Sequence, residues 1–302
     1  MGLVVGASYA TLAQVAPDVR PGLDLIVRPD LPAEAYLWIF LPPLLFQAAL
    51  TADVRSMMPD AAPILLLAVV AVFVATGLIG WTLSVVSGEA IAVCLLLGAI
   101  VATTDPSAVI AIFRDLGAPA RLNRLVEGES LLNDAAAIAL VGVMIATIAG
   151  DPAGTGPGTA IRMLALGFGG GVTCGYIAGQ AIVMVLPWLN RLPVAAATLT
   201  LAVPCPLYIG TEEFLHASGV VSVVTAGLVI GAYGPTPLSP SNWKHLDLIW
   251  AQISVLAGAI VFLLAAVQVP DLLSGMGPWD VLYLLVVVIA ALALSRCSWL
   301  NG

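Results

Sequence analysis

Residues 61–86 read AAPILLLAVVAVFVATGLIGWTLSVV, an apolar run without a charged side chain. A helix needs about 20 apolar residues to cross the hydrocarbon core of a bilayer, so this run predicts a transmembrane helix. The whole chain has the same character, since 61% of its 302 residues are hydrophobic and 9% are charged. Soluble domains carry roughly 25% charged residues. The sequence therefore predicts an all-α polytopic protein that is integral to the cell membrane, with the lipid bilayer as its surroundings.

Similar runs recur between short polar or Pro/Gly-rich breaks, which indicates one transmembrane domain over residues 1–302. The net charge is −8 and no basic patch is present, so no nucleic-acid partner is expected. About ten spans are predicted, at residues 1–16, 36–51, 61–86, 89–113, 127–149, 160–186, 194–210, 215–233, 248–269 and 278–298.

The basic side chains predict the orientation, because short cytoplasmic loops of membrane proteins are enriched in Lys and Arg. If the loop 114–126 is cytoplasmic, seven of the ten Lys and Arg residues fall on the cytoplasmic side and three outside. The opposite orientation is disfavoured.

Within the span 89–113, Thr104 and Asp105 stand directly before Pro106. Proline lacks an N–H and clashes with the preceding helical turn, and Thr and Asp are frequent N-cap residues. We therefore predict two half-helices, 90–102 and 106–113, with unwound backbone between them. Free carbonyl and hydroxyl oxygens there would suit a cation, as in discontinuous transporter helices. A simple proline kink is the alternative.

A second polar stretch opens the span 127–149. Glu127, Ser130 and Asp134 follow an i, i+3, i+7 pattern and share one helix face, while Glu129 and Asn133 lie on the neighbouring stripe. An Asp at the centre of a membrane helix costs roughly 2.5–3.5 kcal/mol on insertion scales, so Asp134 is interpreted as functional. Glu127 is interpreted as an interfacial charge at the helix start.

Other polar residues are weaker indications. Gln47 either faces the same cavity or bridges two helices, and Glu212, Glu213 and His216 are interpreted as an outer rim. His216 and Ser218 raise the possibility of a serine hydrolase. No Gly-x-Ser-x-Gly pattern surrounds Ser218, which disfavours an enzyme.

The two polar stretches are similar to a known family. Residues 104–109 read TDPSAV and residues 127–135 read EGESLLNDA, and they resemble the sodium/proton antiporters of the NhaP and eukaryotic sodium/hydrogen exchanger type. Further stretches that carry the resemblance are 40–46 (FLPPLLF), 113–117 (FRDLG), 215–219 (LHASG) with 226–228 (AGL), and 260–264 (IVFLL).

The resemblance implies an inverted-repeat fold, a homodimer, and a mobile ion-carrying core mainly within 61–149. In that family the residue matching Asp134 binds the cation and the proton alternately, and Asn133 resembles the mark of electroneutral members. Thr104, Asp105 and Ser130 match positions that shape the ion site. Pro106 and Glu129 match supporting positions, and Glu129 resembles the acid that pairs with an arginine on a later helix.

The chemistry of exchange follows from one carboxylate. Asp134 in a water-poor cavity holds either H⁺ or a cation, and oxygen ligands from Asp134, Thr104 and Ser130 suit Na⁺ or Li⁺. This predicts 1:1 Na⁺/H⁺ exchange by alternating access, with the ions as cargo and no cofactor.

Two departures from the family leave alternatives open. The chain has Gln47 where members usually carry an acid, and by comparison it lacks one N-terminal and two to three C-terminal helices, so a truncated sequence is expected. The alternative functions are a K⁺/H⁺ antiporter, or an inactive truncated homologue that acts as a regulatory or assembly partner.

Overall fold

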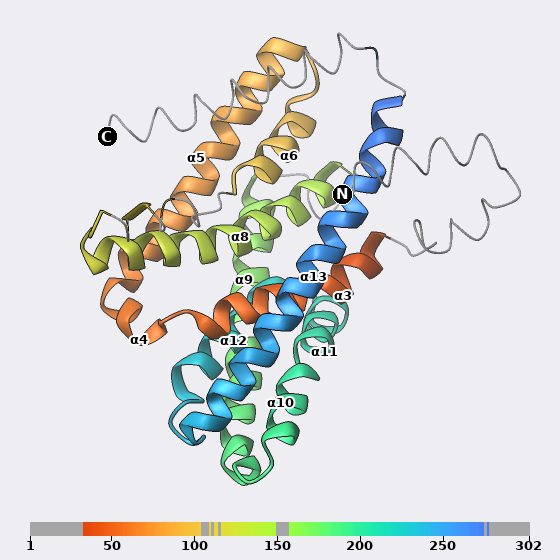
Figure 1. The fold of residues 1–302 in the computed structure, drawn as a ribbon. Helices are drawn as coiled ribbons and strands as arrows, with labels where there is room; N and C mark the ends of the chain where they lie inside the picture. The colour runs from red at the N-terminus through yellow and green to blue at the C-terminus, as the bar shows by residue number, and fades with distance from the viewer. Residues whose placement is uncertain are drawn as a thin grey trace, which may run out of the picture.

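The computed structural model describes residues 33–103, 109, 112–113, 116–148, 157–274 and 277. Throughout this part of the chain all regular structure is helical, as predicted (Figure 1). The elements are α3 (Ala33–Thr51), α4 (Val54–Met57), a 3₁₀ turn (Met58–Asp60), α5 (Ala61–Ser87), α6 (Ile91–Val101), α8 (Ala120–Ile148), α9 (Pro157–Val185), a 3₁₀ turn (Leu186–Leu189), α10 (Pro193–Leu201), α11 (Pro204–Ile209), a π-helical turn (Gly210–Phe214), α12 (Gly219–Tyr233) and α13 (Pro240–Ser274).

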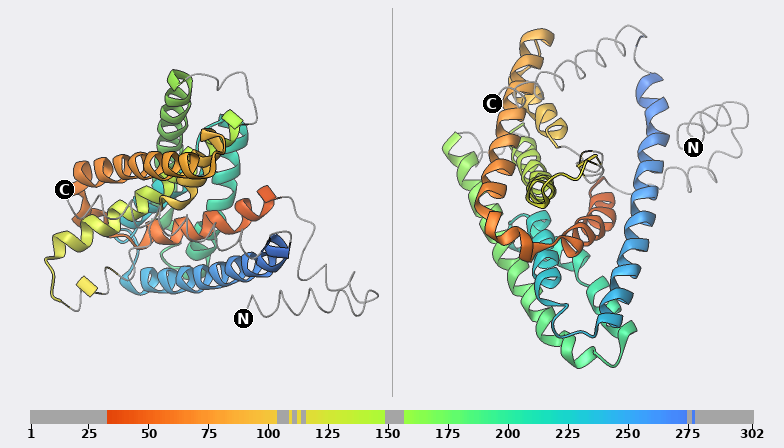
Figure 2. Two further views of the ribbon diagram at one scale, coloured as in Figure 1. Left: turned by 90° about the horizontal axis from the view of Figure 1, so that it is seen from above. Right: turned by 60° about the vertical axis from the view of Figure 1, so that its left-hand side comes forward.

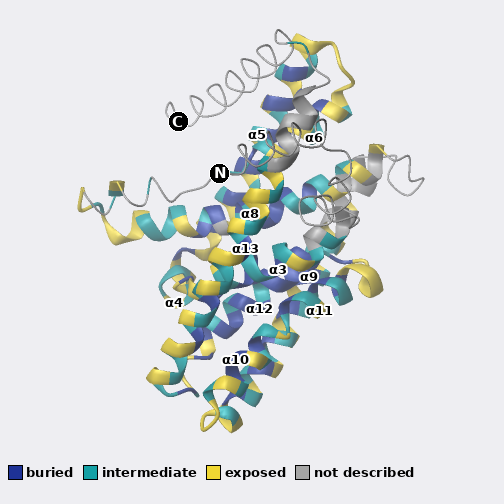
Figure 3. Cartoon of the chain, turned by 45° about the vertical axis from the view of Figure 1, so that its right-hand side comes forward, coloured by how far each residue is buried: buried dark blue, intermediate teal, exposed yellow. Residues whose placement is uncertain are grey.

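Four helical stretches among the described residues are long and apolar enough to cross a membrane, namely Val54–Ser87, Ala165–Leu189, Pro193–Phe214 and Pro240–Ala266. Large apolar side chains also cover the outer faces of the helices, where Figure 3 shows exposed residues on most elements. Phe262 and Val255 of α13 are 78% and 74% exposed, and Trp81 of α5 is 64% exposed. Such surfaces are stable against lipid chains and not against water. The chain is an integral membrane protein.

Several helices differ in extent from the predicted spans. The predicted span 194–210 is divided, because Pro204 and Pro206 cannot donate to the preceding turn and α10 ends at Leu201. The expected loop 114–126 is wrong in part, since α8 already begins at Ala120, directly after Pro119. The predicted spans 1–16 and 278–298 lie outside the described residues.

The larger of the two packed groups is centred on α12. Glycines of α9 let the two backbones approach closely, because a Cβ at Gly171 would lie 2.6 Å from the Ser218 carbonyl oxygen and one at Gly175 would overlap the Ser222 carbonyl. On its other side α12 packs against α3 through Gly227, where a Cβ would meet the Phe46 carbonyl oxygen at 2.9 Å. This close packing makes α12 the centre of the group.

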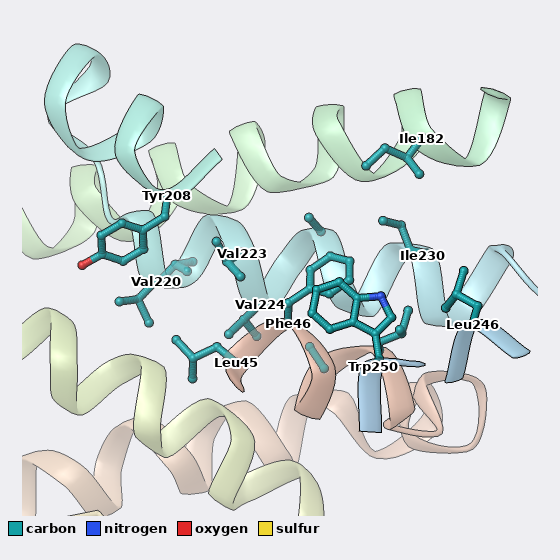
Figure 4. Packing of buried hydrophobic residues seen from close by; sticks show 14 of the residues in the cluster. Leu45, Phe46, Ile182, Tyr208, Val220, Val223, Val224, Ile230, Leu246 and Trp250 are labelled. Atoms are coloured by element: carbon teal, nitrogen blue, oxygen red, sulfur yellow. The ribbon is translucent and has the colours of Figure 1, made fainter. Parts of the chain in front are cut away.

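Aromatic side chains complete this core (Figure 4). The rings of Phe46 on α3 and Trp250 on α13 lie 4.7 Å apart between centroids, and both are fully buried. The indole Nε1 of Trp250 donates to Thr200 Oγ1 on α10 at 3.1 Å, so its polar atom is satisfied. The α12-centred group therefore includes α3, α9, α10, α11, α12 and α13.

The smaller group consists of α5, α6 and α8. Val72 of α5, Ala99 of α6, and Ala136 and Ala137 of α8 form one buried cluster. Ala135, the preceding residue of α8, belongs to the α12-centred cluster instead. Consequently α8 is the helix of the smaller group that meets the larger one, with α5 and α6 on one side of it and α9 and α12 on the other (Figures 1 and 2).

Basic side chains of the described loops gather at one end of the molecule. Arg55 contacts Ala232 at the end of α12, and Arg121 at the start of α8 contacts Asp60 at the start of α5. Asn242, two residues before Lys244, donates a hydrogen bond from Nδ2 to the carbonyl of Asn190, the residue before Arg191. We call this end, where α3, α9 and α12 finish, the basic end.

Candidate functional site

The polar stretch of α8 lies at the interface between the two packed groups, which we call the seam. Asn133 and Ser130 are buried, Asp134 is half-buried, and Glu127 is exposed two turns earlier. Ala135 packs with the α12-centred group and Ala136 with the α5–α6–α8 group, so the Asn133–Asp134 turn sits where the two groups meet. A carboxylate at such a seam is near surfaces that belong to two different packed bodies.

Asn133 is held by its neighbour one turn back. Its Nδ2 donates to Glu129 Oε1 at 3.3 Å, which confirms that these two residues share the predicted stripe of α8. The Asn133 side chain is 1% exposed, and its Oδ1 has no hydrogen-bond partner among the described residues. A buried amide oxygen that accepts no hydrogen bond can instead coordinate Na⁺, which binds hard oxygen ligands.

Thr76 of α5 is a buried polar residue that sequence reasoning missed. Its Oγ1 has no hydrogen-bond partner in the described part of the chain, and its carbonyl packs where a Cβ at Gly98 of α6 would lie 2.7 Å away. The signal was a hydroxyl residue near the middle of the apolar run of α5, away from the other hydroxyl residues at the end of that helix. Such residues are common in membrane helices, where they usually bond their own backbone.

The predicted break in the α6 region is seen on one side only. The helix α6 ends at Val101, with Ala102 as its C-cap and Thr103 outside the helix, close to the predicted end at residue 102. Thr104, Asp105 and Pro106 lie outside the described residues. Their predicted role as cation ligands and helix breaker therefore stays a prediction.

Gln47 lies on α3, which packs mainly against α12 and α13. Its side chain is half-buried, and its carbonyl accepts a hydrogen bond from Thr51 Oγ1 at 3.0 Å. Gln47 thus belongs to the α12-centred group, opposite the group that carries Asp134.

The His216–Ser218 stretch is structural. Ser218 caps α12 by accepting from the Val221 N–H at 3.3 Å, and its own N–H donates to the Gly167 carbonyl at 2.9 Å. His216 has a positive φ of 49° and is exposed, like Glu212 and Glu213 of the π-helical turn. Among the described residues, no hydrogen bond joins His216 to Ser218.

A cluster at the basic end was also missed. Arg121 Nε donates to Asp60 Oδ1 at 2.9 Å, and Arg124 Nη2 lies 3.8 Å from Asp60 Oδ2. The sequence showed both arginines as loop charges, and Asp60 did not stand out because its partners are about sixty residues away.

Comparisons with known proteins agree with this architecture. The fold is that of the sodium proton antiporter MjNhaP1 from Methanocaldococcus jannaschii, with a TM-score of 0.67 at 20% identity over 98% of this chain and 74% of that one. The helices and their buried polar turn thus define an all-helical membrane protein of the NhaP antiporter fold. A family model, "Sodium/hydrogen exchanger, transmembrane", matches residues 1–300. The chain belongs to the sodium/hydrogen exchanger family.

Two curated relatives give the same family. The Na⁺/H⁺ antiporter ApNhaP of Aphanothece halophytica is 36% identical over 99% of this chain and 59% of its own length. The low-affinity Na⁺/H⁺ antiporter NhaS1 of Synechocystis sp. is 33% identical over 97% of this chain and 57% of its own length. The chain therefore spans somewhat more than half the length of these relatives.

Proposed function

We propose that this chain carries the ion site of an exchanger that moves Na⁺ against H⁺ across the cell membrane, with Asp134 as the group that binds both. The observation that carries the proposal is the position of the Asn133–Asp134 turn on α8, between the two packed groups. The relatives ApNhaP and NhaS1 are Na⁺/H⁺ antiporters, which supports this substrate pair.

Competition at one carboxylate couples the two ions. A carboxylate removed from bulk water is unstable as a bare anion, so it binds a proton or a cation. When Na⁺ arrives, the proton leaves Asp134, and when the proton returns, Na⁺ is released. Because Asn133 is neutral, this turn supplies one carboxylate, and the cycle exchanges one Na⁺ for one H⁺ without moving net charge.

Neutral oxygens complete the site. The Ser130 hydroxyl lies one turn before Asp134 on the same helix, and the partnerless Oδ1 of Asn133 is adjacent. At the predicted break before Pro106, Thr104 would add a further neutral oxygen and Asp105 a carboxylate oxygen. Such a set of hard ligands suits Na⁺ or Li⁺.

Alternating access would come from movement of one packed group past the other. The α5–α6–α8 group falls within residues 61–149, the segment expected to hold the mobile core, and the α12-centred group would be the fixed body and the dimer-forming part. The basic end would face the cytoplasm, because Lys and Arg are retained on that side.

The test is exchange by the full-length protein in everted membrane vesicles, with a fluorescent indicator of the internal pH. Addition of NaCl should dissipate an imposed pH gradient, and KCl at the same concentration should have a much smaller effect. Equal responses to both salts would favour a K⁺-transporting exchanger of mixed selectivity. No response to either salt would support the alternative of an inactive homologue.

A further inference from the structure

An apolar cavity of about 250 Å³ lies in the seam between the two packed groups. The helix α4 contributes Met57, the start of α5 contributes Ile64, α8 contributes Ala135, and α12 contributes Val224, with α9 closing the remaining side. Thr225 is the one lining residue with a polar side chain. A buried water needs two to four polar partners, so this cavity suits an apolar occupant and not water.

The cavity opens toward the lipid. Three of its lining residues, Met58, Leu65 and Val172, are 63%, 49% and 37% exposed and lie on outer faces of their helices. Methionine is flexible and adapts to irregular apolar partners. A lipid chain therefore has a lateral route from the bilayer into the seam.

A second cavity, of about 290 Å³, adjoins the first at the basic end. Val54 of α4 lines both cavities. The second cavity is bounded by the end of α12 and the start of α13, where Trp243 forms part of the wall. Tryptophan is enriched at the headgroup level of membranes, which places this cavity where lipid headgroups lie.

Charges of both signs line the second cavity, namely Arg55 and the carboxylates of Asp53 and Asp247. Asp53 Oδ1 accepts a hydrogen bond from the Ser56 N–H at 3.3 Å. Arg55 donates from Nε to the Ala232 carbonyl at 3.0 Å and from Nη2 to Thr236 Oγ1 at 2.9 Å. These bonds fix the guanidinium and leave three of its five N–H donors available. Asp247 of α13 also lines the cavity and has neither an ion-pair nor a hydrogen-bond partner among the described residues.

The fixed guanidinium of Arg55 and the carboxylate of Asp247, which has no partner among the described residues, complement a headgroup that itself carries both charges. We propose that an aminophospholipid with a phosphoethanolamine headgroup binds here, with its phosphate on Arg55, its ammonium on Asp247, and one acyl chain reaching past Val54 into the apolar cavity. A primary ammonium donates hydrogen bonds to the Asp247 carboxylate, whereas the quaternary ammonium of a choline lipid has no N–H to donate. A glycerol headgroup lacks the cation altogether.

This binding is independent of the proposed exchange, so it is measured without transport. The full-length protein is purified in detergent and mixed with phosphatidylethanolamine, phosphatidylcholine or phosphatidylglycerol, and bound lipids are counted by native mass spectrometry. Asp247→Asn removes the partner of the ammonium. Ala61→Trp fills the apolar cavity from its rim, and Ala62→Trp is the matched control, because Ala62 is also exposed but does not line the cavity.

The wild-type protein and Ala62→Trp should retain about one phosphatidylethanolamine and prefer it over the other two lipids. Asp247→Asn should reduce that preference roughly ten-fold, the size expected for one charge-assisted hydrogen bond, and Ala61→Trp should reduce binding of the lipid itself. Unfolding temperatures close to that of the wild type would verify that the variants are folded. Equal retention of phosphatidylcholine, a preference for phosphatidylglycerol, or unchanged binding by Ala61→Trp would overturn the proposal.

Discussion

Asp60 and Arg121 join the first turns of two helices that are far apart in sequence. Both Nε and Nη2 of Arg121 lie 2.9 Å from Oδ1 of Asp60, at the start of α5 and the start of α8. The Asp60 side chain is 9% exposed, whereas that of Arg121 is 66% exposed. The pair fastens α5 to α8 at the basic end, next to the close contact between Gly128 and Ile64. The ion pair and this contact together hold the start of α5 against the start of α8.

Asp60→Ala should therefore lower the unfolding temperature of the purified protein. The loss is about 1–2 kcal/mol, between the values for exposed and for fully buried pairs, because Arg121 is largely solvated while Arg124 loses its buried counter-charge. Glu89→Ala at the opposite end of α5 is the control and should leave the unfolding temperature unchanged. If the two changes lowered the unfolding temperature equally, the ion pair would not contribute to the stability of the contact between α5 and α8.

The contact between α9 and α12 should tolerate no added side chain at Gly175. Gly175→Ala places a methyl group against the Ser222 carbonyl, and overpacking of this kind costs about 1–3 kcal/mol. Gly169, on the same helix, has no atom within 4 Å of its Cβ position. Gly169→Ala should be neutral or slightly stabilising, since Ala is about 1 kcal/mol better than Gly in a helix. Thermal unfolding in detergent compares the two, and a neutral Gly175→Ala would contradict the close packing.

Sequence patterns predicted the helices well where apolar runs end at strong signals. The run 61–86 corresponds to α5 (Ala61–Ser87), which finishes at Gly88 with a φ of 72°. The start of α8 was missed by seven residues, because Arg121 and Arg124 read as loop charges until Asp60 is placed beside them. The division into two packed groups could not be predicted from the sequence, because it depends on which helices each face of α8 contacts.

For the site, the sequence identified the polar stripe of α8 but not its surroundings. The bond from Asn133 to Glu129 follows from their i, i+4 spacing. The orphaned hydroxyl of Thr76 and the cavity beside Val224 depend on contacts between distant segments, which no local pattern encodes. Arg55 and Asp247 line one cavity although almost two hundred residues separate them in the sequence, so no local pattern predicts that they lie together.

Ser130→Ala should weaken Na⁺ binding more than it slows exchange. Removal of one neutral oxygen ligand should raise the Na⁺ concentration for half-maximal exchange roughly five-fold, equivalent to about 1 kcal/mol, with the maximal rate largely kept. Ser84→Ala on α5, where the hydroxyl bonds only the Glu89 carbonyl, is the control. A Na⁺ dependence identical to that of the wild type would exclude the Ser130 hydroxyl from the ion site.

Exchange should be insensitive to membrane voltage. The Asn133–Asp134 turn has one ionisable side chain, so one proton is replaced by one Na⁺ and the carrier has the same charge in both directions. In proteoliposomes, an imposed K⁺ diffusion potential should leave the initial rate of Na⁺-driven pH change unaltered. A rate that rises with voltage would require a second charge in the cycle.

The most direct test of Asp134 as the carrier compares two carboxylates of the same helix. Asp134→Asn and Glu127→Gln are prepared in the full-length protein, and Na⁺-driven pH change is measured in proteoliposomes with equal amounts of folded protein. Asp134 is half-buried at the seam and Glu127 is exposed near the start of α8. Asp134→Asn should abolish exchange, because an amide neither releases a proton nor balances a cation, while Glu127→Gln should retain it. Full exchange by Asp134→Asn would contradict the assignment of Asp134 as the group that carries both ions.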